Sequence, residues 1–415
     1  MSGVFAQIGA ARELLAAPAS VTAGTGTAGT PNIATLTFGA AHNMRVGDVF
    51  TLSGATPSGW NGTWAVATVV DATHLTFQTG TTLLANTTVQ PTVSNVSQWG
   101  VFTTVSRFFE FVPPESLKGD YGRVVSKSLR SGSLVGRSNE FVPYIKGGGG
   151  DLTLEVWSKG FGYWLAGMLG TVTTTGPNAD GMSTHTGTIG SLRGVSYTVQ
   201  KGVPSSAAGT VYTFTYNGMK VTAWTLECDV DGTLTCKLSF DGQTESLTVP
   251  LAVAAYPSSP ELLSFVAGTV TVAGTQVAIV KKWSVTMANT LAADRRAIAP
   301  SPLQSEQLAN GERTITVTMD AEFYDNANLA RYTAATAAGT MAAVVLKCVG
   351  QTIVGSAPGT PASLTITMPN FRLDGETPTV ASAALPMAGL PGVALNTPGQ
   401  NDAITIAYVT SDATP

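Results

Sequence analysis

The sequence has little charge and little cysteine, and each shortage excludes a class of protein. Charged residues make up 12% of the 415 residues, and 22 Lys and Arg against 26 Asp and Glu leave a net charge of -4. This balance gives no chain-wide reason to expect affinity for nucleic acid. The three cysteines, Cys228, Cys236 and Cys348, are too few for a disulfide framework and include no CxxC pair for zinc.

Long apolar runs are also missing. The first residues, "MSGVFAQIGAARELLAAP", lack a basic region followed by an apolar core, and no window approaches about 18 uninterrupted apolar residues. We therefore expect synthesis in the cytosol, without general secretion. The length predicts two or three packed units. A surface poor in charge and rich in Thr is typical of a protein covered by identical neighbours.

Motifs for catalysis or cofactor binding are scarce. The segment Gly24–Gly29, "GTGTAG", matches a dinucleotide fingerprint but opens no helix, so it is interpreted as a linker. "DVD" at 229–231 lacks the further carboxylates of a calcium loop and is interpreted as a turn. His42, His74 and His185 have no metal-ligand spacing, and we expect them at the surface. The sequence predicts no enzyme, no cofactor and no metal site.

What the sequence has in abundance is short alternating strand patterns in two blocks. Residues 21–97 consist largely of Thr, Ala, Gly, Val and Asn, with runs such as "IATLTF" and "TWAVATVV" between turn signals, which predicts a small all-β domain. Residues 1–20 are expected to form an N-terminal arm. Residues 98–415 are expected to form a larger, mainly β domain into which 21–97 is inserted.

The alternation in the larger domain assigns side chains to opposite faces of strands. Trp224, Leu226 and Cys228 share an apolar face, as do Leu234 to Phe240 at every second residue and Ile315 to Phe323 in the same way. The opposite faces are polar and carry Thr225, Glu227, Asp229, Thr235, Lys237, Ser239, Asp241, Thr316, Thr318, Asp320 and Glu322. Antiparallel sheets with one apolar and one polar face can close with other subunits into a barrel around an aqueous lumen.

Turn chemistry predicts the connections. Asx-Gly pairs at Asn217, Asp231 and Asp241 predict turns of a β-meander. Between the middle pair of strands, matching apolar faces requires an odd-length turn with Gly232 left-handed and Cys228 opposite Leu234. Cys228 and Cys236 are then diagonal neighbours at roughly 7–8 Å, so we expect free core thiols.

Helix signals are few. "DLTLEVWSKGFGYWLAGMLG", 151–170, predicts a strand and then a short apolar helix against a sheet. "DNANLARYTAATAAG", 325–339, predicts a helix capped by Asp325 and ended by Gly339. The linker 288–311 is expected to hold one short helix.

A basic segment follows the aromatic strand "RFFEF". Residues 101–150 hold seven Lys or Arg and four acids, whereas the stretch from Leu291 holds ten acids and six bases. Opposite signs favour head-to-tail contacts between copies, with the loop 113–133 on the next copy. Candidate contact residues are Lys118, Asp120, Arg123, Lys127, Arg130 and Arg137. A solvated loop without a partner is the alternative; DNA binding is less favoured, because no aromatic residues alternate with the basic ones.

Several segments in order resemble the tail tube protein (major tail protein) of long non-contractile-tailed bacteriophages. They are "GVFAQIGAARE", "VSRFFEFVPPESLKGDYGRVVSKSLRSGS", "GDLTLEVWSKGFGYWLAGMLG", "VYTFTYNGMKVTAWTLECDVDGTLTCKLSFDGQ" and "LTITMPNFRLDGETPTV". The block 21–97, with "HNMRVGDVFTLSGATPSGWNGTWAVATVVDATHLTF", resembles a β-module common in phage structural proteins.

The resemblance implies a β-sandwich or barrel fold with one or two short helices, hexameric rings, and a 24-stranded inner barrel to which each copy contributes four strands. It implies stacking of rings through the 113–133 loop, other tail proteins at the tube ends, a tape measure protein and then DNA in the lumen, and a place in the virion tail after synthesis in the host cytoplasm. It also implies that the polar-face residues of Thr225–Asp241 and Thr316–Glu322 named above face the lumen. Their acidic members would let phosphates pass without binding, and Lys237 departs from that pattern. We expect the inserted module to project outward.

Two other functions are compatible with the sequence. The first is a tail-tip or adhesin protein that binds carbohydrate on a host surface through the β-module. The second is a head decoration or other virion protein. Polymerisation without a ligand would distinguish the tube protein from both.

Overall fold

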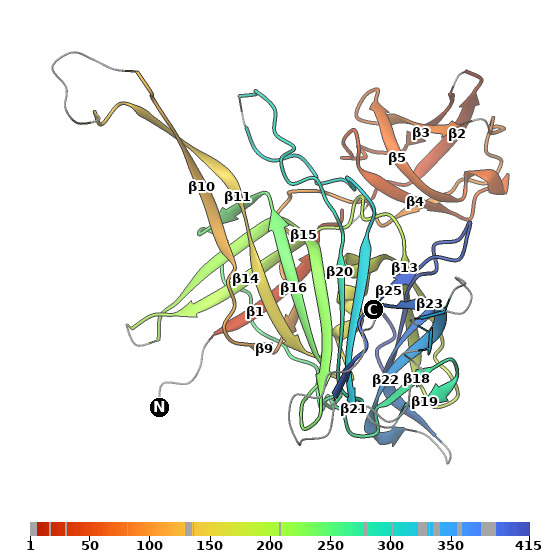
Figure 1. Cartoon of the computed structure of the whole chain (residues 1–415). Helices are drawn as coiled ribbons and strands as arrows, with labels where there is room; N and C mark the ends of the chain where they lie inside the picture. The colour runs from red at the N-terminus through yellow and green to blue at the C-terminus, as the bar shows by residue number, and fades with distance from the viewer. Residues whose placement is uncertain are drawn as a thin grey trace.

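The structure is a computed structural model of the whole chain, and it is mainly β (Figure 1). It describes residues 6–15, 18–29, 31–80, 82–128, 135, 137–206, 209–277, 280–300, 302–322, 330–331, 333–334, 341–354, 359–374 and 387–415. Two separate sheets, each with its own apolar core, divide the described residues.

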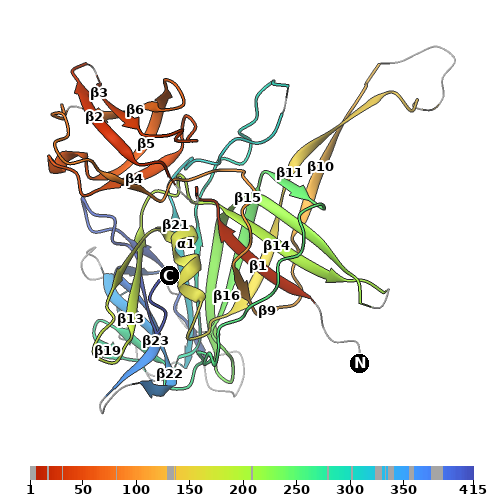
Figure 2. The ribbon, with the colours of Figure 1, turned by 180° about the vertical axis from the view of Figure 1, so that it is seen from behind.

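The smaller sheet belongs to the block 21–97 and lies at one end of the molecule (Figures 1 and 2). Its strand order is β2-β3-β6-β5-β4-β7. The elements are β2 (Val21–Thr27), β3 (Asn32–Phe38), β4 (Val49–Ser53), the 3-10 helix η1 (Ser58–Trp60), β5 (Gly62–Val69), β6 (His74–Gly80) and β7 (Thr92–Ser94). Phe77 contacts the rings of Phe50, Trp60 and Trp64, so large aromatic side chains fill this small core.

The second sheet contains a continuous antiparallel wall. Its strands are β10 (Lys118–Val125), β11 (Phe141–Glu155), β15 (Val211–Asp229), β16 (Thr235–Gly242), β20 (Val280–Ala288) and β21 (Thr314–Glu322). They pair in the order β10-β11-β16-β15-β20-β21. We call β11, β16, β15, β20 and β21 the wall sheet.

The N-terminal half of β15 leaves the wall sheet for a side layer. There it pairs with β14, which pairs in turn with β1, so residues 7–12 of the expected arm are a strand with buried Ile8, Ala10 and Ala11. The remaining strands of this layer are short. Its elements are β1 (Gln7–Arg12), β8 (Arg107–Phe109), β9 (Phe111–Val112), β14 (Tyr197–Pro204) and β17 (Thr244–Ser246).

A back layer covers the apolar face of the wall sheet. β23 joins β22, β25 and β26, and β26 joins β13. Its strands are β12 (Gly170–Thr175), β13 (Ser183–Ile189), β18 (Thr269–Val272), β19 (Thr275–Gln276), β22 (Met341–Val354), β23 (Thr360–Leu373), β24 (Met387–Gly389), β25 (Gly392–Leu395) and β26 (Thr405–Thr410). The 3-10 helix η2 (Phe161–Trp164) and helix α1 (Leu165–Leu169) lie between the layers, as 151–170 predicts.

The predicted apolar faces of the wall strands are confirmed. Trp224, Leu226, Leu238 and Val317 are all nearly inaccessible and belong to the main core cluster. The register of β15 and β16 pairs Leu226 with Cys236 and ends with Glu227 opposite Thr235, one pair before the predicted Cys228–Leu234 pair. Cys228 and Cys236 are free and buried, as expected, and Cys348 is free and buried as well.

Two of the three predicted Asx-Gly turns are wrong. Asn217-Gly218 lies within β15, where Gly218 has a φ of 62° at a bulge opposite Tyr197–Val199. Asp241-Gly242 forms the end of β16. A left-handed glycine suits a bulge as well as a turn, and tertiary pairing decides between them. In the third turn the left-handed residue is Asp231, with a φ of 65°, not Gly232.

The expected helix in the linker is absent from the described part of 288–311, which after the end of β20 is irregular, with bends at 298–300 and a bridge between Leu291 and Ala309. The predicted helix 325–339 lies mainly outside the described residues, as does Phe323 at the end of the predicted apolar face.

Candidate assembly surfaces

The wall sheet carries a polar face opposite the core. In its register Thr225 lies between Lys237 and Thr286, and Glu227 lies between Thr235 and Ser284. The strand pairs therefore place nearly all of the predicted lumen residues on one continuous surface, which also includes Asp151, Thr153, Glu155, Lys282, Ser284 and Thr286. Sequence reasoning missed these because it did not establish that β11 and β20 flank the meander.

Acidic groups outnumber basic groups on that polar face. Its carboxylates are Asp151, Glu155, Glu227, Asp229, Asp320 and Glu322, and its lysines are Lys237, Lys281 and Lys282. Each lysine forms an ion pair: Lys237 with Asp151 at 2.8 Å, Lys281 with Glu322 at 2.7 Å, and Lys282 with Asp229 at 3.2 Å. Lys237 also lowers the pKa of Asp151 by hydrogen bonding. The lysines are thus neutralised in place, and the face keeps a negative excess.

Asp241 departs from the predicted lumen set. Its Oδ2 accepts hydrogen bonds from the amide groups of Gln304 at 3.0 Å and Gln307 at 2.8 Å. Both glutamines are buried. The segment between β20 and β21 therefore covers this carboxylate, which the strand alternation alone places on the polar face.

The predicted 113–133 loop is in part a strand. β10 pairs with β11 from Lys118 opposite Gly149 to Val125 opposite Phe141, and the two strands extend away from the body as a ribbon (Figures 1 and 2). We call these strands the β10–β11 hairpin. The length of these strands was missed because the partner of β10, 141–149, lies beyond the predicted loop 113–133.

The predicted contact residues lie on or near this hairpin. Lys146 pairs with Asp120 at 3.0 Å, and Arg137 pairs with Glu140 at 2.7 Å. Lys118, Arg123 and Lys127 are exposed and form no ion pair within the described residues, which leaves a positive excess. Arg130 lies outside the described residues.

Apolar side chains occupy both faces of the hairpin near its outer end. Directly paired residues project to the same side, so Val124 and Val142 share one face and Val125 and Phe141 share the other. All four are exposed. A ribbon of two strands is marginally stable in water on its own, and apolar groups on both faces require cover from elsewhere.

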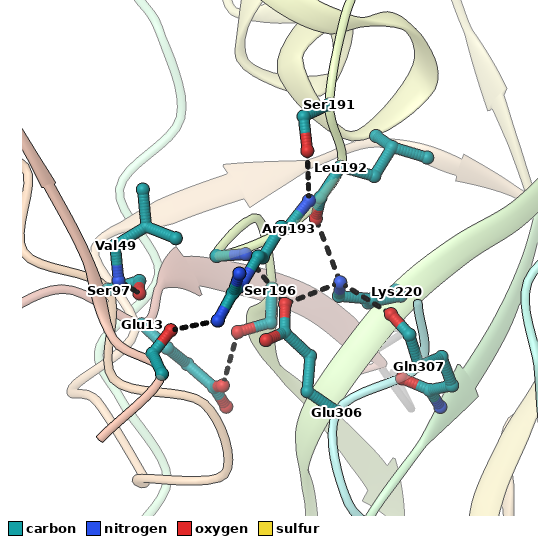
Figure 3. Close-up of polar contacts among 12 residues, drawn as sticks. Glu13, Val49, Ser97, Ser191, Leu192, Arg193, Ser196, Lys220, Glu306 and Gln307 are labelled. Carbon is teal, nitrogen blue, oxygen red and sulfur yellow. Dashed lines mark hydrogen bonds and ion pairs between the residues drawn. The ribbon is translucent and has the colours of Figure 1, made fainter. Parts of the chain in front are cut away.

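A buried ion pair lies where the small sheet meets the larger domain (Figure 3). Lys220 Nζ donates to Glu306 Oε1 at 2.7 Å and to the carbonyl oxygens of Leu192 and Gln307. Burial lowers the pKa of Lys220, and Glu306 opposes that shift. Next to this pair, Arg193 donates to Gly47 O at 3.4 Å.

Glu13, which lies just before the inserted block, joins three separate segments of the larger domain by hydrogen bonds. Its carboxylate is buried and accepts hydrogen bonds from Ser196 Oγ at 2.6 Å, Gly218 N at 2.7 Å and Gly100 N at 2.9 Å. Burial raises the pKa of Glu13, and these donors oppose the rise. Nearby, Leu14 bridges Ser97, so the residues before and after the block lie side by side.

The described residues hold no cluster of three or more His, Cys, Asp or Glu side chains suited to a metal ion. The expectation of surface histidines is wrong for two of the three. His42 accepts a hydrogen bond from Met44 N at 3.0 Å, and His185 contacts Thr174 Oγ1 at 2.8 Å; both are buried with partners for each ring nitrogen. Among the described residues no helix is long and apolar enough to cross a membrane.

Comparison with known families gives one assignment. A search of curated proteins finds no match. The family model described as phage tail tube protein matches residues 96–410, which include the wall sheet, the β10–β11 hairpin and the back layer, and exclude β1 and the small sheet. The match covers well over half of the chain and agrees with the resemblance seen in the sequence, so this chain belongs to the phage tail tube protein family.

Proposed function

We propose that six copies of this chain form a ring and that rings stack head to tail into a hollow tube, which conducts DNA during ejection. The family match makes the chain a structural component of a phage tail, and the ring, the stacking and the conduit are our proposal. Before DNA passes, the lumen would hold a tape measure protein, and other tail proteins would bind the tube ends.

The polar face of the wall sheet supports this proposal most directly. β16, β15, β20 and β21 are consecutive hydrogen-bonded strands with one apolar face against the back layer and one polar face in solvent. Six such sets would form a 24-stranded barrel wide enough for an aqueous channel. The negative excess on the polar face would repel phosphates, so DNA would slide past without binding.

In the proposed organisation residues 98–415 are the tube domain and 21–97 are an inserted module on the outside of the tube. The hydrogen bonds of the module support this position, because those within the described residues reach Arg193 and Trp99 and not the polar face of the wall. Of the N-terminal arm 1–20, residues 7–12 would stay in the sheet. Synthesis in the host cytoplasm would precede assembly.

Negative-stain electron microscopy of the purified chain at raised concentration tests the proposal. We expect hollow filaments with a regular ring repeat and sixfold end views. Discrete trimers or single particles at every concentration would contradict the tube, and glycan binding by 21–97 would then favour an adhesin.

A further inference from the structure

An aromatic hollow lies at the C-terminal end of β11, near Glu155. The part of β11 that pairs with β10, 141–149, is at the other end of the strand. The hollow opens to solvent, and its empty space of about 420 Å³ includes part of that open solvent. Phe109, Trp157 and Phe161 line it together with Tyr256 and Pro257. The side chain of Tyr256 is 44% exposed. Rigid aromatic and proline groups of this kind are typical of sites that receive an apolar side chain.

The hollow also contains an indole N–H without an acceptor in the described part of the chain, and several charged groups. The Nε1 of Trp157 is buried and donates to no acceptor there. Two carboxylates, of Glu110 and Glu155, and one ammonium, of Lys159, line the hollow. Neither carboxylate forms an ion pair within the described residues; Glu155 accepts a hydrogen bond from Thr233 Oγ1 at 3.3 Å, and Lys159 Nζ donates to Ser258 O at 2.8 Å. The lining therefore keeps a negative excess of one charge. A guest that suits this site would bring an apolar side chain, a free carbonyl oxygen and a positive charge.

The outer end of the β10–β11 hairpin has these features. It carries exposed Val124 and Val125 next to Arg123, a cation without an ion-pair partner in the described residues. As a two-stranded ribbon it also has free backbone carbonyl groups on its outer edges.

The hairpin cannot reach the hollow of its own chain. Residues 141–149 of β11 pair with β10, whereas Leu154 pairs with β9 beside the hollow. A strand rises about 3.3 Å per residue, so the 15 residues of β11 separate the two sites by on the order of 45 Å.

We infer that the outer end of the β10–β11 hairpin binds the aromatic hollow of a second copy in the adjacent ring. This inference rests on the proposed stacking of rings. Val124 or Val125 enters between Tyr256 and Phe161, and the basic flank of the hairpin meets Glu110 and Glu155. Head-to-tail repetition of the contact is open-ended, because the two surfaces lie at opposite ends of one strand.

Thiol cross-linking tests the contact directly. A Val124→Cys/Pro257→Cys chain is assembled under reducing conditions, checked by electron microscopy, and treated with a short bismaleimide. The native cysteines are buried, so the introduced thiols dominate the reaction. We expect covalent ladders that continue beyond six subunits, which a closed six-membered ring cannot give. Val142→Cys/Pro257→Cys is the second variant, should the first fail to assemble.

A Val70→Cys/Pro257→Cys chain is the matched control, because Val70 is 60% exposed and Val124 is 63% exposed. Intact tubes without ladders, or ladders of equal length in the control, overturn the contact while leaving the tube proposal standing. If the unmodified chain forms no tubes at all, the proposed function itself fails.

Discussion

Lys220 shows how one buried residue ties the wall sheet to the segment that follows β20. Only 2% of its side chain and 15% of that of Glu306 are exposed. A buried cation is tolerable only with its partner in place, because an unpaired charge in a low-dielectric interior is strongly unfavourable.

We therefore expect Glu306→Ala to lower the free energy of unfolding by about 3 kcal/mol, since it leaves Lys220 without a counter-charge. Chemical denaturation of the unassembled subunit measures this loss. Glu306→Gln keeps an acceptor for Lys220 and is the control, with a smaller expected loss. Equal stability of the wild type and Glu306→Ala would show that the pair contributes nothing net.

At the scale of elements, the β10–β11 hairpin is a strand pair that only neighbours can cover. Val124→Ser/Val142→Ser removes apolar area from exposed positions, so we expect a change in subunit stability within about 0.5 kcal/mol and a marked loss of polymerisation. Thermal unfolding and sedimentation of the polymer measure the two effects.

Val70→Ser, on the module, changes an equally exposed valine and should leave polymerisation intact. If the hairpin variant polymerised like the wild type, the apolar groups at its outer end would have no role between copies.

At the scale of the whole molecule, the chain enters and leaves the small sheet through two segments that lie side by side. Leu15 N donates to Val96 O at 2.8 Å, and Gln98 N donates to Glu13 O at 2.8 Å. A chain in which a short Gly-Ser link replaces 18–94 should therefore fold and form tubes of smaller outer diameter, because the ends to be joined are already close.

Electron microscopy of this deletion variant gives tube formation and diameter together. A folded variant that forms no tubes would show that the module takes part in assembly. If the two tubes had the same outer diameter and the wild-type tube had the narrower lumen, the module would lie inside the tube.

The charge of the wall predicts how the assembled tube treats DNA. Thr316 and Thr318 are exposed on the polar face, so Thr316→Lys/Thr318→Lys should make tubes retain DNA, with retention that falls as salt rises. Nuclease protection of added DNA measures retention. Thr92 is exposed on the module, and Thr92→Lys is the control. Retention unchanged by the wall lysines would exclude these residues from the lumen.

Alternation predicted correctly which side of each wall strand is buried, because a strand projects side chains to its two faces with period two. Turn chemistry failed for Asn217-Gly218, since a left-handed glycine serves a bulge in a long strand as well as a turn. The expectation of surface histidines failed for His42 and His185, whose burial depends on partners distant in the sequence, such as Asp412 for His185.

The sequence by itself determined the mainly β class, the apolar and polar faces of the wall strands, and membership of the tail tube family, because these depend on local periodicity and on the order of motifs. Only the tertiary structure decided that residues 118–125 pair with 141–149 in a long hairpin, that Gln304 and Gln307 cover Asp241, and that each lysine on the polar face of the wall has an ion-pair partner. Those properties depend on which distant segments pack together, and local patterns carry no information about that choice.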